Sequence, residues 1–345
     1  MERGVRCPRT GLAAVLSVAL VAAGAGVSCG PATRCGADHP VALTERFALH
    51  SDPLVNLHHF LGSWASSDLG SPSNRPRVSG EERAIHTTFG AEDRERWDAA
   101  LLLYAEMETA PGGHSEALDL LREESGRLRG EAADMDGMGP GTFETLEEVM
   151  DLYCAHWWPA HALANQEWVD ELAPILDRHE EVFVEATERL YGSVWPQEPW
   201  RIDISAYAPF VGYASQRGAI VIHSTDALNA GLGGVETIFH ELQHTRAISA
   251  TLADRLEEAG RRSAESLPAE IGHALIYATA GEVTRGIALL EEAPDHAPFW
   301  VRQDFERLPG WDELLPAIEV HWLPAVRGER SVDEALDALI RALER

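Results

Sequence analysis

Lysine is absent from this 345-residue chain, so all 28 of its basic residues are arginines. Acidic residues number 56, which gives a formal net charge of −28. A nucleic-acid-binding surface needs clustered cations to neutralise phosphates, and anionic lipids attract basic segments. The composition therefore excludes nucleic acid as the main partner and argues against docking on lipid through a basic surface. The hydrophobic share of 45% and the charged share of 24% are typical of a folded globular protein.

Cysteine is also scarce, with four residues at Cys7, Cys29, Cys35 and Cys154 and no CxxC pair. Without such pairs, a zinc module built from cysteines is excluded. In an oxidising compartment the spacing leaves two disulfides open, Cys35 with Cys154 or Cys29 with Cys35. Which of them forms depends on where the N-terminal segment is cleaved.

Residues 1–28 have the pattern of a signal peptide, because three arginines in the first ten residues precede an uncharged apolar run from Gly11 to Val27. That run is shorter than the roughly 20 residues of a membrane-spanning helix. Gly26-Val27-Ser28-Cys29 resembles a bacterial lipobox, although a leucine is expected where Gly26 stands. We therefore expect an exported protein, either anchored in the cell envelope by a lipid on Cys29 or released to the periplasm or the exterior. Membrane contact is expected only through this anchor.

Composition and periodicity divide the rest of the chain into four segments. They are a loop-rich N-terminal segment (29–93), a helical region (94–191), a metal-binding core (192–292) and a C-terminal helical region (293–345). In the first of them, the glycines, serines and prolines between Ser63 and Gly80 predict a loop. In the helical region, the glycine-rich stretch from Gly130 to Gly141 breaks the pattern.

The segment 192–292 combines two strand patterns with two helical ones. Trp200–Ser205 alternates apolar and polar residues like a half-buried strand, and Ala219–Ser224 is a more buried strand. One helix is expected from about Val235, and a second long helix from about Leu267 to Leu290. The predicted fold is α+β and predominantly helical, with a helical N-terminal part, a small sheet and then a pair of long helices.

The residues His240-Glu241-Leu242-Gln243-His244 form an HExxH sequence on the first of these helices. Residues four apart share one helix face, so the two imidazoles can bind one Zn²⁺ together. Glu241 lies beside them, where it can take a proton from an attacking water. Chance alone would produce HExxH in roughly one such sequence in twenty. The amphipathic pattern of the surrounding helix nevertheless favours a metal centre over two surface histidines.

The order of strand, short loop, HExxH helix and second helix with a glutamate resembles the core of gluzincin-type zinc metallopeptidases. Residues 191–290 are most similar to a group of uncharacterised bacterial HExxH proteins. The resemblance is carried by Tyr191-Gly192, Trp195-Pro196, Gly212-Tyr213, Glu236 to His244, His273 to Tyr277 and Gly281-Glu282, and less distinctively by Trp157-Trp158, His161, Asn165 and Trp168. It implies a zinc-dependent hydrolase acting on peptides or proteins, with Glu241 as general base. It also allows His273 and Tyr277 a role in polarising a substrate carbonyl or the tetrahedral intermediate. The alternative for His273 is a hydrogen-bonded histidine of the core.

The gluzincin pattern calls for a third metal ligand, a glutamate from the second helix. Glu270 falls in the first turn of that helix, where the helix dipole already explains an acid. Glu282 closes an apolar stretch, and a buried carboxylate there needs a cation as its partner. These two residues and His273 are candidates, together with Glu265, which falls in a polar connector and is expected to be solvated.

Hairpin geometry favours Glu282 among them. If the motif helix continues to about Gly260 and the chain returns from about Leu267, a residue level with His244 lies close to Val283, at 1.5 Å per residue. Glu282 then completes the site with His240 and His244. A helix break near Ser249 or Ala250 would instead favour Glu270 or His273.

Other histidines and aromatic residues carry weaker signals. Tyr213 and His223 are candidates for the lining of a cleft, whereas His58-His59 and His161 have no ligand spacing and are interpreted as structural, with Trp157 and Trp158 as core aromatics.

An alternative function is a non-catalytic envelope lipoprotein, a binding or scaffold protein with a structural metal site. A closed four-ligand site would favour that alternative, and an open coordination position would count against it.

Overall fold

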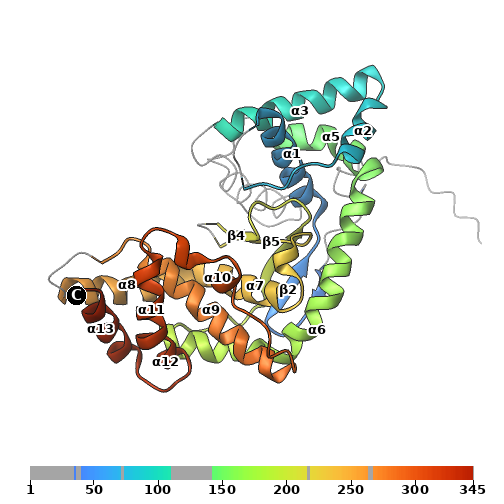
Figure 1. The fold of residues 1–345 in the computed structure, drawn as a ribbon. Helices are drawn as coiled ribbons and strands as arrows, with labels where there is room; N and C mark the ends of the chain where they lie inside the picture. Colours follow the sequence, from blue (N-terminus) through green and yellow to red (C-terminus); the bar gives the residue numbers. More distant parts are fainter. Residues whose placement is uncertain are drawn as a thin grey trace, which may run out of the picture.

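The structure is a computed structural model that describes residues 35, 40–70, 74–109, 142–215, 218–262 and 267–344. The predicted signal peptide, Cys29 and the glycine-rich stretch 130–141 lie outside the described residues. The described chain confirms an α+β, predominantly helical fold with one small mixed sheet (Figure 1). Within these ranges, no helix combines the length and the apolar character needed to cross a bilayer.

The elements follow one another along the chain in the following order. They are β1 (Pro40–Leu43), β2 (Phe47–His50), α1 (Pro53–Leu69), α2 (Gly80–Thr87), α3 (Ala91–Thr109), α5 (Thr142–His156), α6 (Trp158–Tyr191), β3 (Trp200–Ser205), β4 (Gly212–Ala214), β5 (Ile220–His223), the 3₁₀ helix η2 (Ala227–Asn229), α7 (Leu232–His244), α8 (Arg246–Arg262), α9 (Ile271–Leu290), α10 (Phe299–Arg302), the 3₁₀ helix η3 (Phe305–Arg307), α11 (Trp311–His321), α12 (Leu323–Val326) and α13 (Val332–Leu343).

The sheet has the strand order β1-β2-β3-β5-β4, with parallel pairs in the middle and an antiparallel pair at each end. Ile220 and Ile222 of β5 belong to the large core formed with α6 and α7, whereas Val221 packs with Val55 of α1. Both faces of β5 are therefore covered. This explains why its sequence is a continuous apolar run, as is usual for parallel strands buried on both sides.

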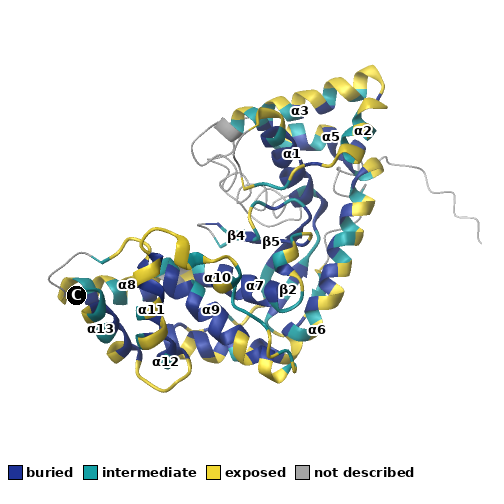
Figure 2. Ribbon diagram, viewed as in Figure 1, coloured by how far each residue is buried: buried dark blue, intermediate teal, exposed yellow. Residues whose placement is uncertain are grey.

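Two hydrophobic cores share one long helix. One core combines the sheet with α7, α9 and the C-terminal helices, and the other lies between α1, α3 and α5. Helix α6 has 34 residues, which corresponds to about 51 Å. It packs against the second core at Trp158 and against the first from Trp168 to Tyr191. Figure 1 shows it running beside both units, and Figure 2 shows buried residues in the sheet, in α7 and α9 and in α1.

The N-terminal segment is more regular than its composition predicts. The loop expected from Ser63 to Gly80 is wrong over its first part, because α1 continues to Leu69, and two strands precede that helix. Ser67 donates its hydroxyl hydrogen bond to the carbonyl of Ser63, one turn earlier, so these polar residues are accommodated within the helix. Gly70, with φ 61°, then ends α1 in the left-handed conformation that glycine adopts most easily.

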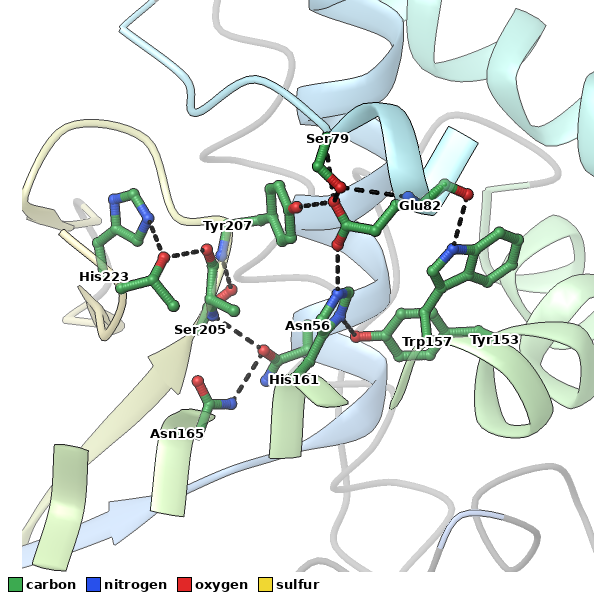
Figure 3. A network of polar contacts seen from close by, with 12 residues as sticks. Asn56, Ser79, Glu82, Tyr153, Trp157, His161, Asn165, Ser205, Tyr207 and His223 are labelled. Carbon is green, nitrogen blue, oxygen red and sulfur yellow. Dashed lines mark hydrogen bonds and ion pairs between the residues drawn. The ribbon is translucent and has the colours of Figure 1, made fainter. Parts of the chain in front are cut away.

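A hydrogen-bonded network joins the N-terminal helices to the sheet (Figure 3). The Tyr207 hydroxyl donates to Glu82 of α2, and the side chain of Asn56 in α1 accepts from the main chain of Ala206. Thr225 donates to the carbonyl of Ala206 and contacts His223 at 3.0 Å. The turn that follows β3 is therefore held from both sides, and the network extends from α2 to the end of β5.

Glu82 should make stability depend on pH in the acid range. Partial burial works to raise the pKa of Glu82, but hydrogen bonds from His161, Ser79 and Tyr207 outweigh it and lower the pKa to about 2. A carboxyl whose pKa is lower in the folded state stabilises the fold above its unfolded pKa, and this contribution is lost as the pH falls towards the folded value. We expect the free energy of unfolding to fall between about pH 4.5 and about pH 2, and less steeply in Glu82→Gln. Urea unfolding across this range measures both slopes, and equal slopes would contradict the assignment.

Cys35 and Cys154 form a disulfide that spans 119 residues of sequence, which selects one of the two pairings left open by the sequence. A cross-link of this length restricts the unfolded chain, so Cys154→Ser should lower the free energy of unfolding by about 2–5 kcal/mol. Urea unfolding with and without a thiol reductant provides the measurement. The reductant should weaken the wild-type protein to the level of the variant and leave the variant unchanged; a wild type insensitive to reduction would argue against a stabilising bridge.

Candidate metal centre

Helix α7 carries the HExxH sequence at its C-terminal end. It begins at Leu232 and ends at His244, because Thr245 is extended, with φ −66° and ψ 142°. The Thr245 hydroxyl donates to the carbonyl of Leu242 at 2.7 Å, which satisfies one of the carbonyls left free at the helix end. Helix α8 starts directly after this break.

The break corrects the prediction of a motif helix that continues to Gly260. Helix α9 begins at Ile271 and packs against α7, so its first turn places His273 beside the motif. Nitrogen atoms of His240, His244 and His273 lie within 4.8 Å of one another. The observed chain therefore agrees better with the alternative of a broken helix, which favoured Glu270 or His273. The break lies at Thr245, earlier than the expected position near Ser249 or Ala250.

The three imidazoles fit a metal ion. The Nε2 atoms of His240 and His244 are 3.1 Å apart, and two nitrogens bound to one tetrahedral ion at about 2.0–2.1 Å would be about 3.3 Å apart. Burial, with the neighbouring histidines, lowers the pKa of His240 well below its usual value. Burial and His273 lower the pKa of His244 to about 4, and burial also lowers the pKa of His273. All three rings are therefore neutral near pH 7, which is the form that binds metals.

Glu282 does not join this group, which corrects its prediction as the third ligand. It follows His273 by nine residues, which places it about 14 Å along α9 and on the opposite face. Its carboxylate accepts from Arg285 at 2.6 Å and from Arg327 at 3.2 Å. The buried acid does have a cationic partner, but that partner is a pair of arginines. Glu270 is exposed at the N-cap of α9 and is also outside the histidine group.

Glu241 is held between α7 and the edge of the sheet, with only 5% of its surface exposed. Burial raises the pKa of Glu241 to about 8, while a hydrogen bond from the main chain of Ala214 in β4 acts in the opposite direction. A divalent cation bound to the histidines would also favour the charged carboxylate. β4 reaches α7 closely because Gly212 has no side chain: a Cβ there would lie 2.8 Å from the Val221 carbonyl and 3.3 Å from Thr237.

Tyr277 lies one turn after His273 on α9, as predicted from the spacing. Its ring is 4.0 Å from that of His240, measured between centroids, and Phe299 of α10 stacks on it at 5.6 Å. Burial raises the pKa of the Tyr277 hydroxyl, so this group stays protonated and can donate a hydrogen bond. His273 was also expected to polarise a substrate carbonyl, but it lies among the candidate metal ligands.

A cleft of about 630 Å³ opens over the three histidines and Glu241. Tyr213 and His223, the weaker candidates from the sequence, both line it. Phe210 also lines the cleft, and its backbone has the left-handed φ of 54°, which is strained for a bulky residue. Its carbonyl accepts from His223 Nδ1 at 2.9 Å if that nitrogen carries the proton, and its N–H donates to Asn74 at 2.7 Å.

His58, His59 and His161, interpreted as structural from the sequence, lie outside the group of candidate metal ligands. His58 Nδ1 lies 2.7 Å from the Tyr104 hydroxyl, and His161 contacts Glu82 at 2.9 Å, both within the N-terminal helical unit. His59 is also buried there and does not belong to the metal-ligand group found among the described residues. Trp157 is a core aromatic, fully buried in the cluster of the N-terminal helices.

Asn229 is a site residue that sequence reasoning missed. Its buried amide donates to the carbonyls of Val211 and His223, and its Oδ1 accepts from Thr237 of α7. One side chain therefore ties β4, β5 and the motif helix together. Asparagine is a common turn residue in a glycine-containing connector, so no sequence pattern distinguished this role.

Comparison of the chain with protein-family models, with curated proteins and with solved structures finds no match.

The ligand set can be tested by metal affinity. His273→Ala should lower zinc affinity by about 100-fold or more, since loss of a direct ligand should cost at least as much as loss of a group that only hydrogen-bonds to a ligand. Glu282→Gln should leave zinc affinity unchanged, because its arginine partners lie on the opposite face of α9. Competition with a chromophoric chelator measures both variants. Weakened binding in Glu282→Gln with normal binding in His273→Ala would restore the sequence-based assignment.

Proposed function

We propose that this protein is a zinc-dependent hydrolase, most simply a metallopeptidase, in which Glu241 is the general base. The observation that carries the proposal is the convergence of three neutral imidazoles and a buried glutamate at the floor of an open cleft. Three protein ligands leave a fourth position for water or substrate, which distinguishes catalytic zinc sites from closed structural ones. Zinc bound there would supply a Lewis acid and lower the pKa of a coordinated water.

The protein groups around this position have complementary roles. The Glu241 carboxylate accepts the proton of the attacking water and returns it to the leaving amine, a transfer typical of glutamate in this position. Tyr277 keeps its hydroxyl proton and donates it as a hydrogen bond to the substrate oxygen on which negative charge develops. His240, His244 and His273 hold the metal through nitrogen atoms that remain unprotonated at neutral pH.

Strand β4 supports a peptide as the substrate. In an antiparallel pair, successive residues direct their main-chain N–H and C=O groups alternately towards the partner strand and away from it. Val211 bonds to His223 and Ser215 to Ala219, so the main-chain groups of Gly212 and Ala214 point away from β5. Ala214 on that side donates to Glu241. An extended peptide that pairs with this edge would therefore pass beside the general base.

The competing proposal, a structural metal site in an envelope scaffold, needs a closed coordination sphere. Within the described parts of the chain the ligand group consists of three histidines, and the cleft gives access to them. The resemblance to gluzincins favours hydrolysis, although His273 stands where that pattern has a glutamate.

We also propose export with attachment through Cys29 or release as a soluble protein, and the Cys35–Cys154 disulfide agrees with an oxidising compartment.

Glu241→Gln should abolish hydrolysis while zinc stays bound, because it removes the base and no ligand. Loss of a general base typically lowers the rate by about 10²–10⁴-fold. A library of quenched fluorescent peptides gives the rate, and metal analysis of the purified protein gives the zinc content. Glu270→Gln, an exposed acid near His273, serves as the matched control and should keep its activity.

Two outcomes would contradict this function. Full activity in Glu241→Gln would exclude the proposed base. A wild-type protein that binds zinc stoichiometrically but cleaves no peptide in the library would favour the structural metal site.

A further inference from the structure

One polar atom of His240 is not used by the metal site. The side chain is only 6% exposed, and its Nε2 faces His244. Its Nδ1 is buried and makes no hydrogen bond to a group of the described residues. When Nε2 of a histidine binds a metal, Nδ1 carries the ring proton. A buried N–H of this kind requires an acceptor, since leaving it unpaired costs free energy.

A small cavity lies against this histidine, beside the open cleft, with which it shares part of its lining. It is lined by Val211, Glu236, Thr237, His240, Tyr277, Ala280 and Phe299, and its volume is about 10 Å³. One water molecule needs about 10–15 Å³ on this scale, together with polar partners. The volume of the cavity is at the lower end of what a single water needs, and Glu236, Thr237 and His240 are polar residues of its lining.

Glu236 lies one turn before His240 on α7 and is only 2% exposed. Its Oε1 accepts from the main chain of Phe299 at 2.7 Å, and its Oε2 accepts from Arg302 at 3.3 Å. His296 Nε2 also lies 3.3 Å from Oε2. Each carboxylate oxygen can accept two hydrogen bonds, so Oε1 retains capacity for a further donor.

We propose that one buried water molecule occupies this cavity, accepts the Nδ1 proton of His240 and donates to Glu236. Glu236 is then a positioning residue that acts on the metal through this water and His240. Contacts of this type fix the tautomer and orientation of a ligating imidazole and strengthen it as a ligand. The same carboxylate holds Phe299 against Tyr277, so it supports two groups at the site. The inference rests on the proposed metal site and does not require hydrolysis.

The test uses zinc affinity and direct observation of the water in the full exported chain. Glu236→Gln should lower zinc affinity by about 10–100-fold, the usual effect of losing such a contact. Ala280→Val leaves Glu236 in place but fills the cavity with two methyl groups, and it should weaken zinc binding in the same direction. Glu282→Gln is the matched control, because it removes a buried carboxylate of α9 whose partners, Arg285 and Arg327, lie away from this cavity, and it should leave zinc affinity unchanged.

A high-resolution crystal structure should show one ordered water between His240 and Glu236. Absence of that water, or unchanged zinc affinity in a folded Glu236→Gln protein, would overturn the proposal. Thermal unfolding identifies variants that fail to fold, and in that case Ala280→Val and the crystal structure decide. A wild type that binds zinc without cleaving peptides would overturn the proposed hydrolysis alone, since every readout here is independent of turnover.

Discussion

The buried amide of Asn229 fixes the distance between the sheet edge and the motif helix, and the rest of the site depends on that distance. Its two donated hydrogen bonds hold the start of β4 and the end of β5, and its oxygen accepts from Thr237 one turn before Glu241. With this side chain in place, the Ala214 N–H reaches the Glu241 carboxylate. The absence of a side chain at Gly212 makes this close approach sterically feasible.

The second constraint comes from the other side of α7. Glu236 attaches the segment that contains Phe299 to the helix, Phe299 stacks on Tyr277, and Tyr277 lies against His240. The first motif histidine is therefore enclosed by aromatic rings and cannot turn freely. A preorganised ligand loses little conformational entropy when it binds a metal, which favours both affinity and a defined geometry.

The sequence predicted the elements whose patterns are local. The fold class, the strands at Trp200–Ser205 and Ile220–His223, and the helix with the HExxH sequence are all observed. The break at Thr245 was not predictable from periodicity, because Ile248 and Leu252 beyond it return to the same core. Their spacing therefore continues the helical pattern across a point where the helix ends.

The third ligand shows where a local argument reaches its limit. A buried glutamate requires a cation, and Glu282 satisfies this requirement with Arg285, one turn later on α9, and with Arg327, 45 positions later in the chain. An arginine and a metal ion meet the same electrostatic need, so the sequence around Glu282 could not separate them. His273, in contrast, gains its place only from the tertiary contact between α7 and α9.

The position of the break also determines which packing contact sets the geometry of the three histidines. The donor set is formed by the last turn of α7 and the first turn of α9, so its geometry depends on how these two helix ends pack against each other. The unit that presents the three histidines is therefore a junction of two helix termini, and not one face of a continuous helix.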